Sequence, residues 1–156
     1  MIKTQIFIAT ITVIAIAATS YASDSIGLGV RAGSATNYDG YFTEVYGDLY
    51  LNRIFSLGAA LAYTSVDRGA TGVKRDTSVP VTALFKVHAP IPFVQPYAGL
   101  GAALVFHNHR NVKGTPVALL GFDLKLGLTP FFLNMEYRRQ FDDKLDYLGG
   151  GVGFKF

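Results

Sequence analysis

Two histidines separated by one residue, His107 and His109, are the clearest candidates for chemistry in the sequence. Residues two apart in a strand point to the same side, and neutral imidazole is a common metal ligand. A metal site needs further ligands, however, and residues 107–115 contain no acidic side chain. The chain has no cysteine, which excludes thiolate metal sites and a thiol nucleophile. We therefore predict neither a metal site nor a cofactor.

A serine and a histidine could together hydrolyse an ester. This reaction requires the serine hydroxyl to lie within hydrogen-bond reach of the histidine ring. The strands predicted below place no serine on the same strand as a histidine, and the third histidine, His88, falls in a turn. The serines considered are Ser25, Ser34, Ser56, Ser65 and Ser78. We predict that the protein is not an enzyme and has no catalytic residues.

The N-terminus has the pattern of a secretory signal peptide. Lys3 gives a positive start, an apolar stretch runs from Ile6 to Ala18, and small residues follow at Ser20 and Ala22. Signal peptidase reads small residues at these two positions. The pattern predicts cleavage after Ala22, so that residues 1–22 are the signal peptide and residues 23–156 the mature protein. A membrane anchor helix is the alternative, but the stretch is shorter than the ~20 residues such a helix needs.

Polar and apolar residues alternate with a period of two through the rest of the chain, which predicts strands and not helices. Most segments are close to the ~9–11 residues that a tilted membrane strand needs. Polar loops at 35–40, 66–77, 107–115 and 142–145 alternate with shorter turns at 51–53, 88–93 and 129–131. This alternation is typical of outer-membrane barrels. The eight predicted strands are Ser25–Ser34, Tyr41–Tyr50, Ile54–Ser65, Ser78–Val87, Val94–Phe106, Pro116–Leu128, Phe132–Phe141 and Asp146–Phe156.

The composition of the polar face of these strands indicates whether that face meets water or a closed interior. It is rich in Gly, Ala, Ser and Thr, as a narrow eight-stranded lumen requires. Its charges also balance, four positive against four negative, and buried charges must pair. We therefore predict a lumen without a sizeable pore, filled by a charge network of Arg31, Glu44, Asp48, Lys86, Asp123, Lys125, Glu136 and Arg138.

Aromatic residues gather near the ends of the predicted strands. Amphipathic rings collect where a membrane meets water, so these residues predict two aromatic girdles. The residues assigned to the girdles are Tyr41, Phe42, Phe55, Tyr63, Phe85, Phe93, Phe106, Phe131, Phe132, Phe141, Phe154 and Phe156.

Two segments, QPYAGLGAAL at 95–104 and the ending YLGGGVGFKF, resemble the small outer-membrane barrels of the OmpA, OmpX and opacity-protein type. The resemblance implies an all-β fold: a closed, antiparallel, eight-stranded, up-and-down transmembrane barrel in the outer membrane of a Gram-negative bacterium. It also implies that Leu148, Val152, Phe154 and Phe156 form the signal read by the barrel-assembly machinery. Because the chain ends at the last strand, we expect no periplasmic domain.

Such barrels serve many purposes, so the resemblance implies a structural or surface-interaction role more than a particular activity. Two alternatives stay open: a lipid A-modifying acyl hydrolase on the same fold, and a periplasmic barrel that binds an apolar ligand. The small, charged face argues against the second alternative, because an apolar ligand needs an apolar lumen.

The predicted loops are mildly basic and suggest an anionic partner. Arg75, Arg110 and Lys113 are candidates to bind lipopolysaccharide phosphates, since guanidinium and ammonium groups form charge-assisted hydrogen bonds to phosphate. An anionic host or matrix ligand would use the same residues. We expect no nucleic-acid binding, because Lys and Arg are interleaved with Asp and Glu and the formal charge is only +3.

Expression in a Gram-negative host should release a mature protein that begins at Ser23. Replacing Ala22 with Arg should block cleavage, because signal peptidase requires a small residue there. The intact mass of the purified protein checks both outcomes. A wild-type mass that includes residues 1–22 would show that these residues are a membrane anchor and not a cleaved signal peptide.

Overall fold

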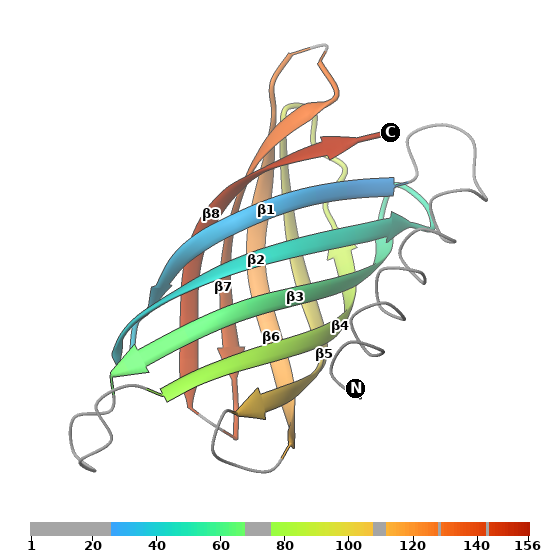
Figure 1. Ribbon diagram of the computed structural model, residues 1–156. Helices are drawn as coiled ribbons and strands as arrows, with labels where there is room; N and C mark the ends of the chain where they lie inside the picture. Colours follow the sequence, from blue (N-terminus) through green and yellow to red (C-terminus); the bar gives the residue numbers. More distant parts are fainter. Residues whose placement is uncertain (1–25, 68–75, 108–111, 128, 143) are drawn as a thin grey trace, which may run out of the picture.

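The computed structural model describes residues 26–67, 76–107, 112–127, 129–142 and 144–156, and these residues form one closed barrel (Figure 1). Each strand pairs antiparallel with the next, and β8 pairs back to β1, so the sheet has no free edge. This confirms the predicted all-β, eight-stranded, up-and-down transmembrane barrel. The strands are β1 (Ile26–Ala35), β2 (Asp39–Tyr50), β3 (Phe55–Asp67), β4 (Asp76–His88), β5 (Val94–His107), β6 (Lys113–Lys125), β7 (Phe131–Gln140) and β8 (Leu145–Lys155). The described residues contain no helix long and apolar enough to cross a bilayer.

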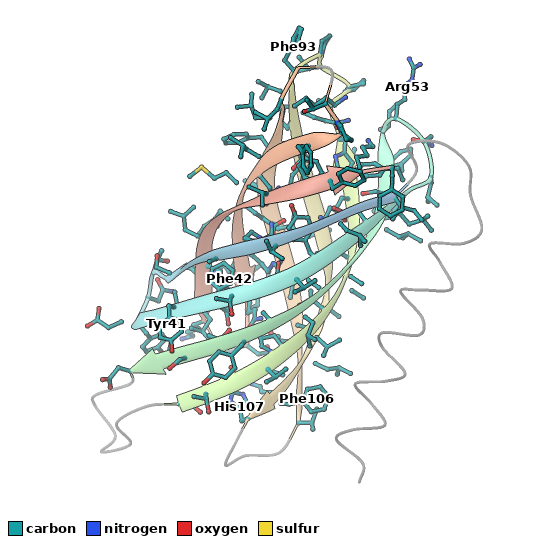
Figure 2. The ribbon with its side chains drawn as sticks, turned by 45° about the horizontal axis from the view of Figure 1, so that its top comes forward. Tyr41, Phe42, Arg53, Phe93, Phe106 and His107 are labelled. Atoms are coloured by element: carbon teal, nitrogen blue, oxygen red, sulfur yellow. The ribbon has the colours of Figure 1, made fainter. Side chains whose placement is uncertain are left out.

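The barrel has two ends that differ in their connections. We call the end where β1 begins and β8 ends the turn end; it carries the connections 51–54, 89–93 and 126–130. The opposite end is the loop end, with the connections 36–38, 68–75, 108–112 and 141–144. Figure 2 shows Arg53 and Phe93 at the turn end and Tyr41, Phe106 and His107 at the loop end.

Several strands extend further into the loop end than the sequence predicted. β2 begins at Asp39 opposite Asp67, and β6 begins at Lys113 opposite Val105. Polar side chains suggested loops here, but the backbone groups of these residues still complete the ladder, as almost all such groups must. The predicted contrast between long loops and short turns is therefore weak, because residues 36–38 and 141–144 connect their strands as tightly as the turns do.

Side chains alternate between the outside and the lumen along most of each strand. Along β7 every second residue is buried, with Glu136 inside and Met135 outside. The outer face is apolar and exposed, as at Leu100 (68%) and Leu120 (62%), whereas charged residues such as Glu136 are 3% exposed. This distribution is the reverse of that in a soluble protein and is the one expected of a barrel surrounded by lipid.

Inside the lumen, large aromatic rings lie over glycines of neighbouring strands. Tyr46 faces Gly29 across the β1–β2 ladder, and Tyr97 faces Gly121 across the β5–β6 ladder. A Cβ atom at Gly29 would lie 2.5 Å from Cζ and Oη of Tyr46, closer than real contacts allow. The frequent glycines of the lumen face thus make room for aromatic side chains in a narrow interior.

Two of the predicted girdle residues belong to this interior. Phe42 and Phe132 are only 4% and 5% exposed, because their positions in β2 and β7 share the inward face with Glu44 and Glu136. A Cβ at Gly149 would meet the ring of Phe42, and one at Gly153 would meet that of Phe132. Other aromatic residues do lie outside near the turn end, where the rings of Phe131 and Phe154 are 5.2 Å apart.

Replacing Gly29 with Ala should lower the free energy of unfolding in detergent micelles by about 1–3 kcal/mol, the usual cost of overpacking. The added methyl group collides with the ring of Tyr46. Gly150→Ala is the matched control, because its Cβ would meet only the carbonyl oxygen of Asn134 at 3.7 Å. Urea denaturation measures both variants, and equal stability would show that the packing over Gly29 is loose.

Candidate functional site

Four charged side chains form a ring of alternating sign across the lumen. Arg138 on β7 contacts Glu44 on β2 (Nη1–Oε2, 2.6 Å) and Glu136 on β7 (Nη2–Oε1, 2.6 Å). Arg31 on β1 contacts the same two carboxylates, with 2.7 Å from Nη1 to Oε2 of Glu136 and 3.1 Å from Nε to Oε1 of Glu44. All four residues are at most 5% exposed. We call them the ion-pair ring.

Neutral polar groups extend the ion-pair ring towards β5 and β6. Asn134 accepts a hydrogen bond from Arg31 (2.8 Å) and donates to Asp123 (2.7 Å) and to the hydroxyl of Tyr97 (2.8 Å). That hydroxyl donates to Oε2 of Glu136 at 2.8 Å. The predicted network lacks Asn134 and Tyr97, although both lie on the polar face of their strands. Both residues alternate with outward-facing apolar residues along their strands, and this pattern indicates that they face the lumen.

A second ion pair lies on the β2 and β4 side of the lumen. Nζ of Lys86 is 2.8 and 2.9 Å from the two carboxylate oxygens of Asp48. The same ammonium group lies 5.7 Å from the ring centre of Tyr46 and 5.1 Å from that of Tyr97, within cation–π range. Lys86 is 2% exposed, so its charge is shielded from bulk water.

Lys125 is the one predicted network residue that the structure places elsewhere. It is the last residue of β6 and is exposed at the turn end. Alternation places it on the lumen face correctly, but it does not show how far along the barrel the residue lies. The described lumen therefore holds three of the predicted cations and four carboxylates, and Asp123 is satisfied by the amide of Asn134 and not by a lysine.

The two ends of the lumen differ. At the loop end, Phe42, Val66, Leu145 and Tyr147 pack with Ala35 into a buried apolar cluster. At the turn end, a cavity of ≈ 900 Å³ opens between the turns and reaches inward to Asp123 and Phe132. The lumen is thus filled at its loop end and middle and hollow at its turn end.

The structure brings together a serine and a histidine that the sequence analysis separated. Oγ of Ser56 on β3 lies 2.7 Å from Nε2 of His88, the last residue of β4. Membership of a single strand does not reveal this pair, because it forms between neighbouring strands. Ser56 is fully buried, and the rings of Tyr50 and Tyr97 lie 5.3 Å on either side of His88. Nδ1 of His88 has no hydrogen-bond partner within the described part of the chain, so no acid orients the ring.

The predicted histidine pair is described only in part. Nδ1 of His107 lies 3.8 Å from Oδ2 of Asp76, and His109 lies outside the described residues. Within the described ranges, no three His, Asp or Glu side chains are grouped so that they could hold a metal ion.

The remaining candidates lie at the loop end and on β8. Arg75 and Arg110 are outside the described residues, as are Ala22 and the rest of the predicted signal peptide. Lys113 is exposed at the start of β6, and its Nζ donates to the carbonyl oxygen of Asp142 at 3.4 Å. The predicted assembly-signal residues all face outward on or directly after β8, at 39%, 52%, 37% and 42% exposure for Leu148, Val152, Phe154 and Phe156.

Solved structures of small outer-membrane barrels share this fold. Neisserial surface protein A is 16% identical with a TM-score of 0.65, over 85% of this chain and 97% of that chain. The outer membrane protein OprG of Pseudomonas aeruginosa is 13% identical with a TM-score of 0.63, over 84% and 94%. Ail of Yersinia pestis, in complex with the heparin analogue sucrose octasulfate, is 15% identical with a TM-score of 0.50, over 84% and 95%.

No protein-family model matches the chain, and no curated protein sequence matches it. The likeness to these structures concerns the fold, and at that level it confirms the predicted resemblance to small outer-membrane barrels. The chain is a closed eight-stranded transmembrane barrel with a charged lumen that is hollow at its turn end.

Replacing Glu136 with Gln should lower the free energy of unfolding by a few kcal/mol, about the cost of breaking a buried ion pair. The change leaves Arg31 and Arg138 with one carboxylate between them, Glu44. Urea denaturation in micelles measures the effect. Asp142→Asn, which removes a charge from an exposed residue, is the control. Equal midpoints for the two variants would mean that the ion-pair ring does not stabilise the fold.

Proposed function

We propose that the protein is a non-enzymatic barrel of the bacterial outer membrane, without a sizeable pore, whose loop end contacts lipopolysaccharide. The observation that carries the proposal is the combination of an apolar outer face with the ion-pair ring inside. The first feature fits a barrel surrounded by lipid, and the second leaves no room for a wide aqueous channel.

The orientation follows from the topology. In the proposed export route, residues 1–22 are removed after Ala22, and the barrel-assembly machinery reads Leu148, Val152, Phe154 and Phe156. The turn end, where β8 ends, then faces the periplasm, and the loop end faces the cell exterior. The neighbours named surface protein and outer membrane protein support this location.

The loop end supplies cations for an anionic partner. Lys113 and Lys144 are exposed there in the described structure, and Arg75 and Arg110 belong to the connecting loops. Such side chains form charge-assisted hydrogen bonds with phosphate groups. Ail was solved with a polyanionic heparin analogue, which supports the same class of partner for this barrel. The short connections at 36–38 and 141–144 offer little protein surface, which favours lipid headgroups over a large host protein.

The two alternatives have less support. An acyl hydrolase would need its nucleophile at the lipid-facing surface, but Ser56 is fully buried inside the lumen beside His88. A barrel that binds an apolar ligand would need an apolar lumen, but the middle of the lumen is occupied by the ion-pair ring.

Replacing Arg75, Arg110 and Lys113 together with Gln should reduce lipopolysaccharide binding at low salt. At high salt the difference from wild type should shrink, because screening weakens exposed charge contacts. Binding to refolded protein in micelles, at two salt concentrations, measures the effect. The same preparations should form no large-conductance channels in planar bilayers.

A matched control removes three charges from the opposite end by replacing Arg53, Lys125 and Lys155 with Gln. The loop-end variant should lose much more lipopolysaccharide binding than this control does. If the loop-end variant binds as wild type does at both salt concentrations, or if both variants lose binding equally, the loop end has no specific contact with lipopolysaccharide.

A further inference from the structure

The cavity at the turn end has features of a binding site. It measures ≈ 900 Å³, lies between the three turns and the end of β8, and is bordered by Arg53, Lys125 and Lys155. Figure 2 shows Arg53 at the rim of this end of the barrel. We propose that the turn-end cavity binds a phosphate-bearing ligand, held by these three cationic side chains.

The charges that line the cavity favour an anion. Three cations face one carboxylate, Asp123, which is 5% exposed and already accepts a hydrogen bond from Asn134 at 2.7 Å. The walls of the barrel exclude water and concentrate the field of these charges at the mouth, which raises the local concentration of anions.

A ring contact places the ammonium group of Lys155, and hydrogen bonds fix the backbone that carries Arg53 and Lys125. Nζ of Lys155 lies 3.6 Å from the ring centre of Tyr50, in a cation–π contact across the mouth. Arg53 lies in a turn that the side chain of Asn52 fixes by accepting hydrogen bonds from the backbone N–H groups of Ile54 and Phe55, both at 2.8 Å. The backbone N–H of Lys125 donates to the carbonyl oxygen of Phe93 at 2.8 Å.

These cations come from three different parts of the barrel: the β2–β3 turn, the end of β6 and the end of β8. A tetrahedral phosphate group has acceptor oxygens that point in several directions, so it can meet donors that approach from several sides. A planar carboxylate suits a single guanidinium better. The arrangement therefore favours phosphate over carboxylate.

The floor of the cavity limits how deep the ligand can enter. Phe132 is 5% exposed and packs against Tyr46 and Ala60, which closes the lumen behind it. The carboxylate of Asp123 repels an anion from the same position. The phosphate group must therefore stay at the mouth, among the three cations.

The surroundings of the mouth are apolar. Leu51, Ile91 and Phe93 lie on the turns that border the mouth and are 56%, 51% and 65% exposed. Apolar side chains at this level anchor a barrel at the membrane boundary, so the mouth lies close to the lipid headgroups on that side of the membrane. A phospholipid headgroup and a soluble phosphate ester both carry the recognised group, and the experiment separates these two sources.

The test uses full-length mature protein refolded in micelles free of lipopolysaccharide. The probes are glycerol 3-phosphate, phosphatidylglycerol and, as a dicarboxylate control, succinate. Calorimetry measures the soluble probes, and native mass spectrometry measures the lipid. Wild type should bind at least one phosphate probe, and succinate should bind at least tenfold more weakly. Binding of glycerol 3-phosphate would show that a soluble phosphate ester is sufficient for recognition. Binding of phosphatidylglycerol alone would show that the site recognises the headgroup of a lipid.

Replacing Arg53, Lys125 and Lys155 together with Gln should weaken phosphate binding at least tenfold. The variant with Arg75, Arg110 and Lys113 replaced by Gln should lose much less affinity for the phosphate probes than the turn-end variant does. Heat-dependent migration on denaturing gels checks that each variant is folded. The charge-retaining variant Lys125→Arg with Lys155→Arg should keep its affinity, because a guanidinium also binds phosphate.

Three results would overturn the proposal: no binding of either phosphate probe by wild type, equal loss in the two Gln variants, or equal affinity for succinate. The last two would show a general attraction of anions and no phosphate site. Phosphate-probe binding by the turn-end variant and lipopolysaccharide binding by the loop-end variant are separate measurements, so this proposal and the proposed surface role can fail separately.

Discussion

The pairing of the first strand with the last is the interaction on which the rest of the barrel depends. β1 and β8 are joined from Gly27 opposite Lys155 to Ala35 opposite Tyr147, and this ladder leaves no unpaired backbone edge to face lipid. Glycines allow the two strands to approach: a Cβ at Gly33 would collide with the carbonyl oxygen of Leu148, and one at Gly151 with that of Val30. The glycine-rich final segment is therefore part of the closure and not a flexible tail.

Closure also creates the environment of the charged groups. Arg31 is on β1 and its partner Glu136 is on β7, two strands away across the β1–β8 seam, so their ion pair exists only when the barrel is closed. Once formed, the ion-pair ring is shielded from water. A charge left without a partner in such a buried place raises the free energy of the folded state. The ion pairs thus stabilise the closed barrel relative to any arrangement in which β1 separates from β8.

The sequence was sufficient to predict the fold class, because period-two alternation marks strands and inverted polarity marks a membrane barrel. It was less informative about position along a strand. Lys125 was placed on the lumen face, but alternation does not distinguish the middle of a strand from its end. Phe132 was assigned by residue type to a girdle, although its alternation with Leu133 indicated the interior. The contact between Ser56 and His88 depends on the register of β3 against β4, which composition alone does not reveal.

The different packing of the two ends has a thermodynamic consequence. The loop end is filled by Phe42, Val66, Leu145 and Tyr147, whereas the turn end holds an open cavity. Water can hydrate the polar groups that line the open end, whereas the apolar side chains of the cluster at the loop end exclude it. The two ends of the barrel are therefore stabilised differently, one by burial of apolar side chains and the other by hydration.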